Sequence, residues 1–295
     1  VGISSRALFD LEEENKIFEE KGLEEYCQYQ IEHETDILKP GAGFQLVKAL
    51  LRINSIIPGK RKTEIIIMSR NSADTSLRIF NSIEHYKLDI SRAALVSGAS
   101  ISPYLTAFNT DLFLSANEYD VQEGINTGIA SGIICTHPEF IIDPNKEIDQ
   151  IRIAFDGDAV LFSDESEQIY QTQGLEAFVM HEKKNAQKPL PEGPFAKLLK
   201  TLSFLQKEFP KDGVPIRTAL VTARNAPAHE RVIRTLREWN VRVDEAFFLG
   251  GVEKSEVLKA FGAHIFFDDQ PTHVGPASKV VPSARVPYKK PELNQ

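Results

Sequence analysis

Cysteines and long apolar runs are scarce in this sequence. Its 295 residues include two cysteines, Cys27 and Cys135, which are too few and too far apart for a disulfide framework. No apolar run approaches the roughly 20 residues that a membrane-spanning helix needs, and no signal-peptide pattern is found. These absences predict reduced thiols, no membrane partner and a cytoplasmic location.

Basic residues are outnumbered by acidic ones. The chain has 34 lysines and arginines against 42 aspartates and glutamates, a formal net charge of −8, which argues against binding to a nucleic acid polymer. Local basic side chains could still bind a single nucleotide. The seven histidines show no metal-ligand spacing, although His273 could lie near a site formed by the residues just before it.

The length of the chain fits two domains of about 140–150 residues each. Hydrophobic residues make up 42% of the sequence, which is enough for two cores. Prolines and charged residues cluster over 137–149, as is typical of a linker. We therefore expect one domain over 1–140 and another over 150–295.

The most informative stretch is IRIAFDGDAVLF, residues 151–162. Its apolar first part predicts a buried strand with Asp156 at the carboxyl end, the edge at which open α/β sheets bind ligands. Gly157 permits a sharp turn, so Asp156 and Asp158 can reach one small volume. One carboxylate could then attack a substrate while the other transfers protons. The alternative is two solvated aspartates in a turn.

Three later segments carry residue types that suit the same chemistry. Carboxylates are the oxygen ligands that Mg²⁺ prefers, and a carboxylate can also act as a nucleophile. A hydroxyl and a lysine can offset the charge of a transferring phosphoryl group. The segments are a strand over 216–222 that ends in Thr222, a helix over 253–261 that begins near Lys254, and a strand over 263–269 that ends in Asp268 and Asp269.

The order Asp-x-Asp, Thr, Lys, Asp-Asp resembles the haloacid dehalogenase (HAD) superfamily of phosphohydrolases. The stretches AFDGDAVLFSDESE (154–167), LVTAR (220–224) and HIFFDD (264–269) are similar more specifically to the cytosolic 5'-nucleotidase I family. The resemblance runs over nearly the whole chain. It implies Mg²⁺-dependent hydrolysis of nucleoside 5'-monophosphates of the AMP type, including deoxy forms, through an aspartyl-phosphate.

The residue types and this resemblance together assign a role to each residue. We expect Asp156 to attack phosphorus, and Asp158 to protonate the leaving oxygen and then activate water. The resemblance further implies that the backbone carbonyl of Asp158 is a metal ligand. Thr222 and Lys254 are expected to bind the phosphoryl group. The predicted metal ligands are Asp156, Asp158, Asp268 and Asp269, and the predicted substrate-binding residues are Arg224, Gly157 and Ala223.

Several of these residues also have structural interpretations. Thr222 could be the N-cap of a helix over 226–238. Lys254 could be a solvated lysine, although a cation is poorly placed at a helix start. Arg224 could bind substrate or form a salt bridge. The polar residues of 163–190 are expected to form a solvated flap.

The first half of the chain resembles the second. At an offset of 152, residues 1–60 align with 153–212 without a gap, and at 153, residues 67–117 align with 220–270. Repeat detection comes before fold assignment, and it predicts an α/β fold of two tandem HAD-like parallel-sheet units, the first degenerate. A chance resemblance is the alternative. The catalytic positions are replaced in the first half: Ser4 for Asp156, Arg6 for Asp158, Ile101 for Lys254, and Ser115 and Ala116 for Asp268 and Asp269.

The insertion between Asp156 and Thr222 is short once a core helix over 195–209 is subtracted. We therefore expect the first half, or a second subunit of a homo-oligomer, to help close the site. Two other functions stay open: a HAD phosphatase acting on sugar phosphates or other small esters, and a nucleotide-binding regulatory protein with little turnover.

Overall fold

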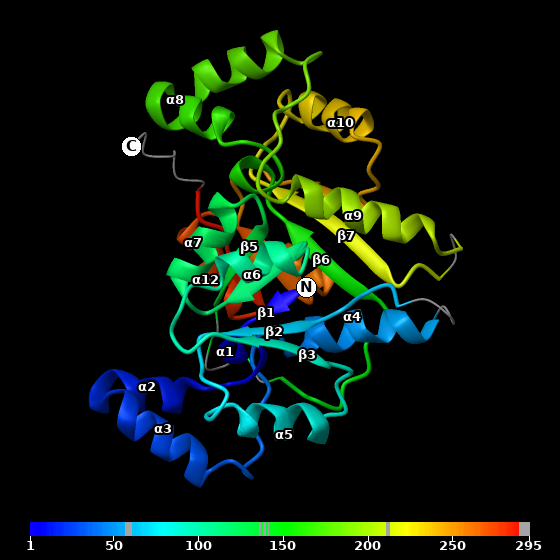
Figure 1. Ribbon diagram of the computed structural model, residues 1–295. Coiled ribbons are helices and arrows are strands. Elements are labelled where there is room, and N and C mark those ends of the chain that lie inside the picture. Colours follow the sequence, from blue (N-terminus) through cyan, green and yellow to red (C-terminus); the bar gives the residue numbers. More distant parts are fainter. Residues whose placement is uncertain (57–60, 136, 138–139, 141, 211–212, 289–295) are drawn as a thin grey trace.

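A single ten-stranded sheet forms the centre of the computed structural model (Figure 1). The structure describes residues 1–56, 61–135, 137, 140, 142–210 and 213–288. The strand order is β3-β2-β1-β4-β5-β10-β9-β6-β7-β8. The strands are β1 (Gly2–Ile3), β2 (Ile66–Ser69), β3 (Arg92–Leu95), β4 (Leu112–Ser115), β5 (Ala130–Cys135), β6 (Ile151–Phe155), β7 (Ile216–Thr222), β8 (Glu245–Phe248), β9 (Ile265–Asp268) and β10 (Ser283–Arg285).

The two halves of the chain contribute five strands each to this sheet. Read outward from the centre, the first half runs β5-β4-β1-β2-β3 and the second runs β10-β9-β6-β7-β8. Neighbours within each half are parallel. The halves meet where β5 and β10 pair antiparallel, with Ala284 opposite Ile134. The predicted α/β class is confirmed, and the continuity of the sheet across both halves is a feature that the sequence does not predict.

Helices surround the sheet. The apolar spacing that predicts a helix over 195–209 corresponds to α9, whose Leu198, Leu199 and Leu202 are buried. None of the described helices is long and apolar enough to cross a membrane. The helices are α1 (Ser5–Leu8), α2 (Glu12–Lys21), α3 (Leu23–Glu32), α4 (Phe44–Ile56), α5 (Leu77–His85), α6 (Ser102–Ala107), α7 (Glu118–Asn126), α8 (Glu165–Lys184), α9 (Ala196–Lys207), α10 (His229–Glu238), α11 (Ser255–Phe261) and α12 (Pro271–Ser278), with a tight turn, η1, over Gly157–Leu161.

Each half carries a pair of helical segments that projects from the body. In Figure 1, α2 and α3 project at the bottom and α8 at the top. Gly22 separates α2 from α3 with φ 91° and ψ −175°, and Gly174 bends α8 with φ 82° and ψ −178°. Such a positive φ favours glycine. The prediction of a polar flap over 163–190 is wrong for residues 165–184, which are helical.

Aromatic packing fixes the central strands of the second half. Phe155 on β6 stacks on Phe267 on β9, with ring centroids 5.6 Å apart and an interplanar angle of 16°. Phe195, just before α9, packs against Phe267 at 4.6 Å. Burying each such side chain stabilises the fold by roughly 1.5–3 kcal/mol. The packing therefore holds the carboxyl ends of β6 and β9 in place, where polar residues follow.

The segment between β5 and β6 contains the predicted linker. Pro138 lies outside the described residues. Further along, the backbone carbonyls of Asp143 and Pro144 accept hydrogen bonds from Gln45 and Lys48 of α4, each at 2.7 Å. The second part of the segment is therefore attached to the first half.

Candidate active site

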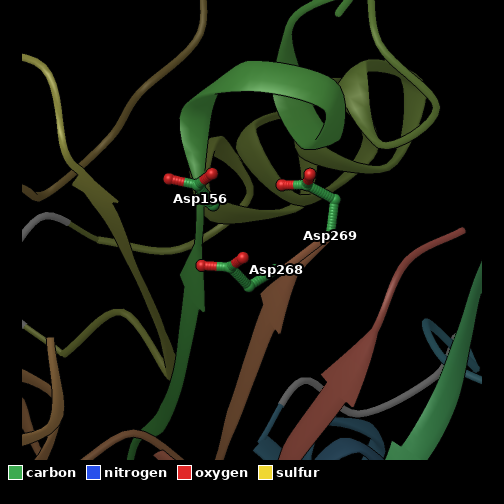
Figure 2. Close-up of side chains that lie close together, drawn as sticks. All are labelled: Asp156, Asp268 and Asp269. Carbon is green, nitrogen blue, oxygen red and sulfur yellow. The ribbon is translucent and has the colours of Figure 1, made fainter. Parts of the chain in front are cut away.

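Three buried carboxylates meet where β6 and β9 end (Figure 2). Phe155 pairs with Phe267 in the parallel β6–β9 ladder, so the next residues along each strand, Asp156 and Asp268, are neighbours. Asp269 follows Asp268, and ligand oxygens of the three aspartates all lie within 4.8 Å of one another. Parallel strands expose ligand sites at this edge. The three form a buried acidic triad.

Lys254 provides the cation of the triad. It stands at the N-cap of α11 and is only 2% exposed. Its Nζ donates to Asp156 Oδ1 at 2.7 Å and to Asp268 Oδ2 at 2.6 Å. Burial alone would lower the pKa of Lys254, but the charges of Asp156 and Asp268 raise it above its ordinary value. The lysine therefore stays charged between two carboxylates.

The three carboxylates of the triad carry more negative charge than Lys254 and their other partners neutralise. Burial, with Asp268 and Asp158 nearby, raises the pKa of Asp156 to about 7 despite Lys254. Burial and the charge of Asp156 raise the pKa of Asp269 to about 8. For Asp268, burial is outweighed by the hydrogen bond with His273 and the charge of Lys254, which lower its pKa.

Asp269 has a partner on only one oxygen. The Tyr288 hydroxyl donates to Asp269 Oδ2 at 2.6 Å, whereas Oδ1 is buried and has no hydrogen-bond partner among the described residues. A buried oxygen without a partner is costly. Together with the shortage of positive charge, this oxygen fits a site that binds a metal ion.

Asp158 belongs to a second buried network. Arg224 donates from Nε to Asp158 Oδ2 at 2.7 Å and from Nη2 to Asp158 Oδ1 at 2.6 Å, and its Nη1 bonds Glu182 Oε2 at 2.5 Å. Arg231 bonds the other oxygen of Glu182 at 2.9 Å. Because Glu182 lies on α8, this network joins the helical insertion to the turn after Asp156.

Close backbone contacts shape that turn. A Cβ on Gly157 would lie 3.2 Å from Thr222 Oγ1, and a Cβ on Gly193 would lie 2.3 Å from the carbonyl oxygen of Phe162. Thr222 is 1% exposed and its hydroxyl accepts a hydrogen bond from Arg224 N at 3.2 Å. Gly193 therefore has no room for a side chain beside η1, the turn that carries Asp158, and Gly157 at the start of η1 has little.

Comparisons with known proteins agree with this geometry. The 5'-nucleotidase family model matches residues 1–292. The chain is 40% identical to human cytosolic 5'-nucleotidase 1B over 304 aligned positions. The alignment covers 98% of this chain and 49% of the human protein. The chain belongs to the 5'-nucleotidase family. It spans about half the length of this curated relative. No solved structure matches.

Family membership confirms the resemblance to cytosolic 5'-nucleotidases that the motifs indicate. The structure gathers Asp156, Lys254, Asp268 and Asp269 at one sheet edge. Thr222 ends β7, and the N-cap of α10 is Ala228, so the interpretation of Thr222 as a helix cap is wrong. The interpretation of Lys254 as a solvated lysine is also wrong, since it is buried.

The other predicted site residues of this family member lie near the acidic triad. Their roles stay predictions. Arg224 forms the salt bridge that one of its two interpretations requires. The side chain of Asp158 faces Arg224, and its backbone carbonyl stays the predicted metal ligand. Ala223 lies between Thr222 and Arg224. The expectation about His273 is confirmed, because its Nδ1 lies 3.2 Å from Asp268 Oδ2.

Three residues of the site are not predicted by the sequence. Glu182 and Arg231 pair across 49 positions, and Tyr288 reaches Asp269 across 19. No local pattern marks a lone glutamate, arginine or tyrosine as part of a site. The insertion contacts the site through Glu182 and through Glu167 of α8, which accepts from Gln270 at 3.3 Å. That the first half or a second subunit helps to close the site stays a prediction.

Proposed function

We propose that the protein hydrolyses nucleoside 5'-monophosphates, AMP and its deoxy form among them, to nucleoside and phosphate with Mg²⁺. The observation that carries the proposal is the contact of Lys254 with both Asp156 and Asp268 inside a buried triad. Membership in the 5'-nucleotidase family supports the nucleotide substrate. The proposed location of the enzyme is the cytoplasm.

The first step transfers the phosphoryl group to the protein. A carboxylate oxygen of Asp156 forms a bond to phosphorus while the bond from phosphorus to the nucleoside 5'-oxygen breaks. Asp158, in its protonated form, gives its proton to that leaving oxygen. Thr222 and Lys254 donate hydrogen bonds to the phosphoryl oxygens and offset the charge that gathers on them.

The second step returns the enzyme to its starting state. Asp158, now a carboxylate, takes a proton from water as the water oxygen bonds phosphorus. The bond between phosphorus and Asp156 breaks, and phosphate leaves. Positioned acid–base help of this kind contributes roughly 10²–10⁴-fold to the rate. Arg224 holds both oxygens of Asp158 and so orients the side chain, and one of these two bonds has to open when Asp158 takes up the proton.

Asp156, Asp268 and Asp269 would hold Mg²⁺, with the backbone carbonyl of Asp158 as a further ligand. Hard oxygen ligands suit this ion, and the oxygen of Asp269 without a partner gives it a binding atom. When bound, the ion offsets the negative charge of the phosphate ester. We further propose that residues 1–140 are a degenerate HAD-like unit and residues 150–295 the catalytic one.

Phosphate release from a panel of esters tests the proposal. The panel contains nucleoside 5'-monophosphates, nucleoside 3'-monophosphates and sugar phosphates, each with Mg²⁺ or with EDTA. We expect the highest kcat/KM on a nucleoside 5'-monophosphate in Mg²⁺ and no turnover in EDTA. A preference for sugar phosphates would overturn the assignment as a nucleotidase but would leave the proposed mechanism standing. No turnover of any ester would favour a nucleotide-binding regulatory protein.

A further inference from the structure

A large cavity lies over the first half, at the sheet edge that corresponds to the proposed active site. Its volume is about 560 Å³, and residues that follow β1, β2, β3 and β4 contribute to its lining. Arg6 follows β1, Arg70 follows β2, and the helical pair α2–α3 forms the outer wall. Arg6 stands where the second half has Asp158.

Two arginines, each already paired with a carboxylate, line the cavity together with Glu14, which is itself paired with Arg78. Arg6 uses Nε and Nη2 to bond Glu12, at 2.9 and 2.8 Å, and its Nη1 has no partner among the described residues. Arg70 bonds Asp120 and the carbonyl of Gly98. A guanidinium has five N–H donors, so both arginines retain donors for a ligand.

A buried amide also lines the cavity. The Nδ2 atom of Asn71 is buried and makes no hydrogen bond of ordinary geometry within the described ranges, and it lies near the Tyr26 hydroxyl, whose pKa the Asn71 side chain lowers against the larger, opposite effect of burial. Asn71 lines the cavity directly after Arg70. A buried donor without a well-formed hydrogen bond is costly unless a ligand or water accepts from it. Together with the two guanidinium groups, it provides convergent donors for an anion.

The wall formed by α2 and α3 is apolar and partly aromatic. Phe18 of α2 and Leu23 and Tyr26 of α3 line it. The rings of Phe18 and Tyr26 meet edge to face at 5.9 Å. Phe18 is 47% exposed and Leu23 is 65% exposed, so this wall still has surface to bury. A ligand with an anionic end and a planar apolar end would satisfy both sides.

We propose that this cavity binds a nucleoside phosphate without hydrolysing it. The phosphate would contact Arg6, Arg70 and Asn71, and the base would pack on Phe18 and Tyr26. The position of the nucleophile is taken by a serine and that of the proton carrier by an arginine. Arginines bind phosphate directly, so binding here requires no metal ion. The proposal does not depend on hydrolysis by the second half.

Titration of AMP into the Asp156→Asn variant of the 295-residue chain in EDTA tests the site. The substitution and the EDTA together prevent turnover. We expect one equivalent of AMP to bind, with adenosine and inorganic phosphate each binding at least about tenfold more weakly, because each fills one side only. Calorimetry gives the stoichiometry and Kd.

Two further substitutions in this background assign the binding to the cavity. Arg6→Gln should weaken AMP binding about tenfold or more, the effect of losing a charged hydrogen bond, and the fold should persist because its partner Glu12 is 54% exposed. Phe18→Ser should weaken AMP but not phosphate. Arg92→Gln is the matched control, since Arg92 makes a similar two-bond pair with Glu64 outside the cavity.

The outcomes separate this proposal from the proposed hydrolysis. No binding in EDTA, or binding that Arg6→Gln leaves unchanged, would overturn it. If AMP binds in EDTA and no further equivalent of AMP binds when Mg²⁺ is added, the result would support the site in the first half and count against the proposed active site in the second half. Phosphate binding as tightly as AMP would overturn the assignment to a nucleoside phosphate.

Discussion

Arg224 holds both carboxylate oxygens of Asp158, with nitrogen–oxygen distances of 2.7 and 2.6 Å. The pair is nearly enclosed, with side chains 2% and 15% exposed. The third contact of Arg224, with Glu182 on α8, makes the orientation of Asp158 depend on the insertion. A planar guanidinium fixes a carboxylate more strictly than an ammonium can. Arg224 is therefore a positioning residue for the proposed proton carrier.

Replacing this arginine by lysine should slow turnover more than it weakens substrate binding. In Arg224→Lys the charge beside Glu182 is kept but the two-bond grip on Asp158 is lost. We expect kcat to fall about tenfold or more with KM little changed. Arg217→Lys is the control, since Arg217 pairs with Glu245 on β7 and β8 away from the triad. A raised KM with unchanged kcat would show instead that Arg224 binds substrate.

Magnesium should stabilise the folded protein. A ligand at a hundred times its Kd adds about 2.7 kcal/mol to the free energy of unfolding. For a protein of this size that raises Tm by roughly 4 °C. Asp269→Asn should lose this increase, while Asp149→Asn, a change at a side chain that is 87% exposed, should keep it. Thermal unfolding with and without Mg²⁺ measures both. An unchanged Tm in the wild-type protein would contradict the metal site.

Gly193 should matter for both stability and turnover. A Cβ there would lie 2.3 and 2.6 Å from the carbonyl oxygens of Phe162 and Val160, so Gly193→Ala must displace η1, which carries Asp158. We expect a loss of about 1–3 kcal/mol of stability and a lower kcat.

The first half offers a matched control for that substitution. A Cβ on Gly41 would lie 2.8 Å from the backbone of Phe9, so Gly41→Ala should lower Tm similarly but leave kcat unchanged. Gly275→Ala, in α12, where a Cβ meets nothing within 4 Å, should leave kcat unchanged and should not lower Tm, because alanine favours a helix more than glycine does. Equal kcat in Gly193→Ala and Gly41→Ala would show that η1 tolerates displacement.

His264 should make the protein less stable in mild acid. Its Nδ1 accepts a hydrogen bond from Arg152 N at 2.9 Å. Burial, with the charges of Lys146 and Arg152, lowers its pKa from 6.5 to about 4. The unfolded chain therefore binds this proton first, and the stabilisation present above pH 6.5 is lost as the pH falls toward 4.

A substitution isolates the contribution of this histidine. His264→Asn removes the titrating ring and keeps an acceptor, so its Tm should fall less than that of the wild-type protein between pH 6.5 and 4. His85→Asn, a change on an exposed face of α5, should follow the wild-type curve. Parallel curves of Tm against pH for all three proteins would contradict the conclusion that His264 is buried in its neutral form.

Local patterns predict the elements of the second half well. The strand over 216–222 is β7 with the same bounds, because a short segment rich in apolar and β-branched residues that ends in a hydroxyl marks a buried strand. Each strand-end residue, such as Asp156 or Asp268, is identified by the same reasoning. Parallel pairing then brings these residues together, so the triad follows from topology.

Contacts between distant segments escape this reasoning. The helix α8 is mostly polar and is interrupted by Gly174, so it has no apolar stripe to reveal it. The antiparallel pairing of β5 with β10 and the contact of Tyr288 with Asp269 depend on how the halves fold together. Charged pairs such as Arg224 and Glu182 follow from three-dimensional packing, which no spacing encodes.

The central claim is that Asp156, on the second half alone, attacks a nucleoside 5'-monophosphate. The most direct test measures phosphate release from AMP with Mg²⁺ by the wild-type protein, Asp156→Asn and Ser4→Ala, the equivalent position in the first half. We predict a loss of at least about 10⁴-fold in kcat for Asp156→Asn, and near wild-type turnover for Ser4→Ala. Turnover of AMP that survives in Asp156→Asn would contradict the account.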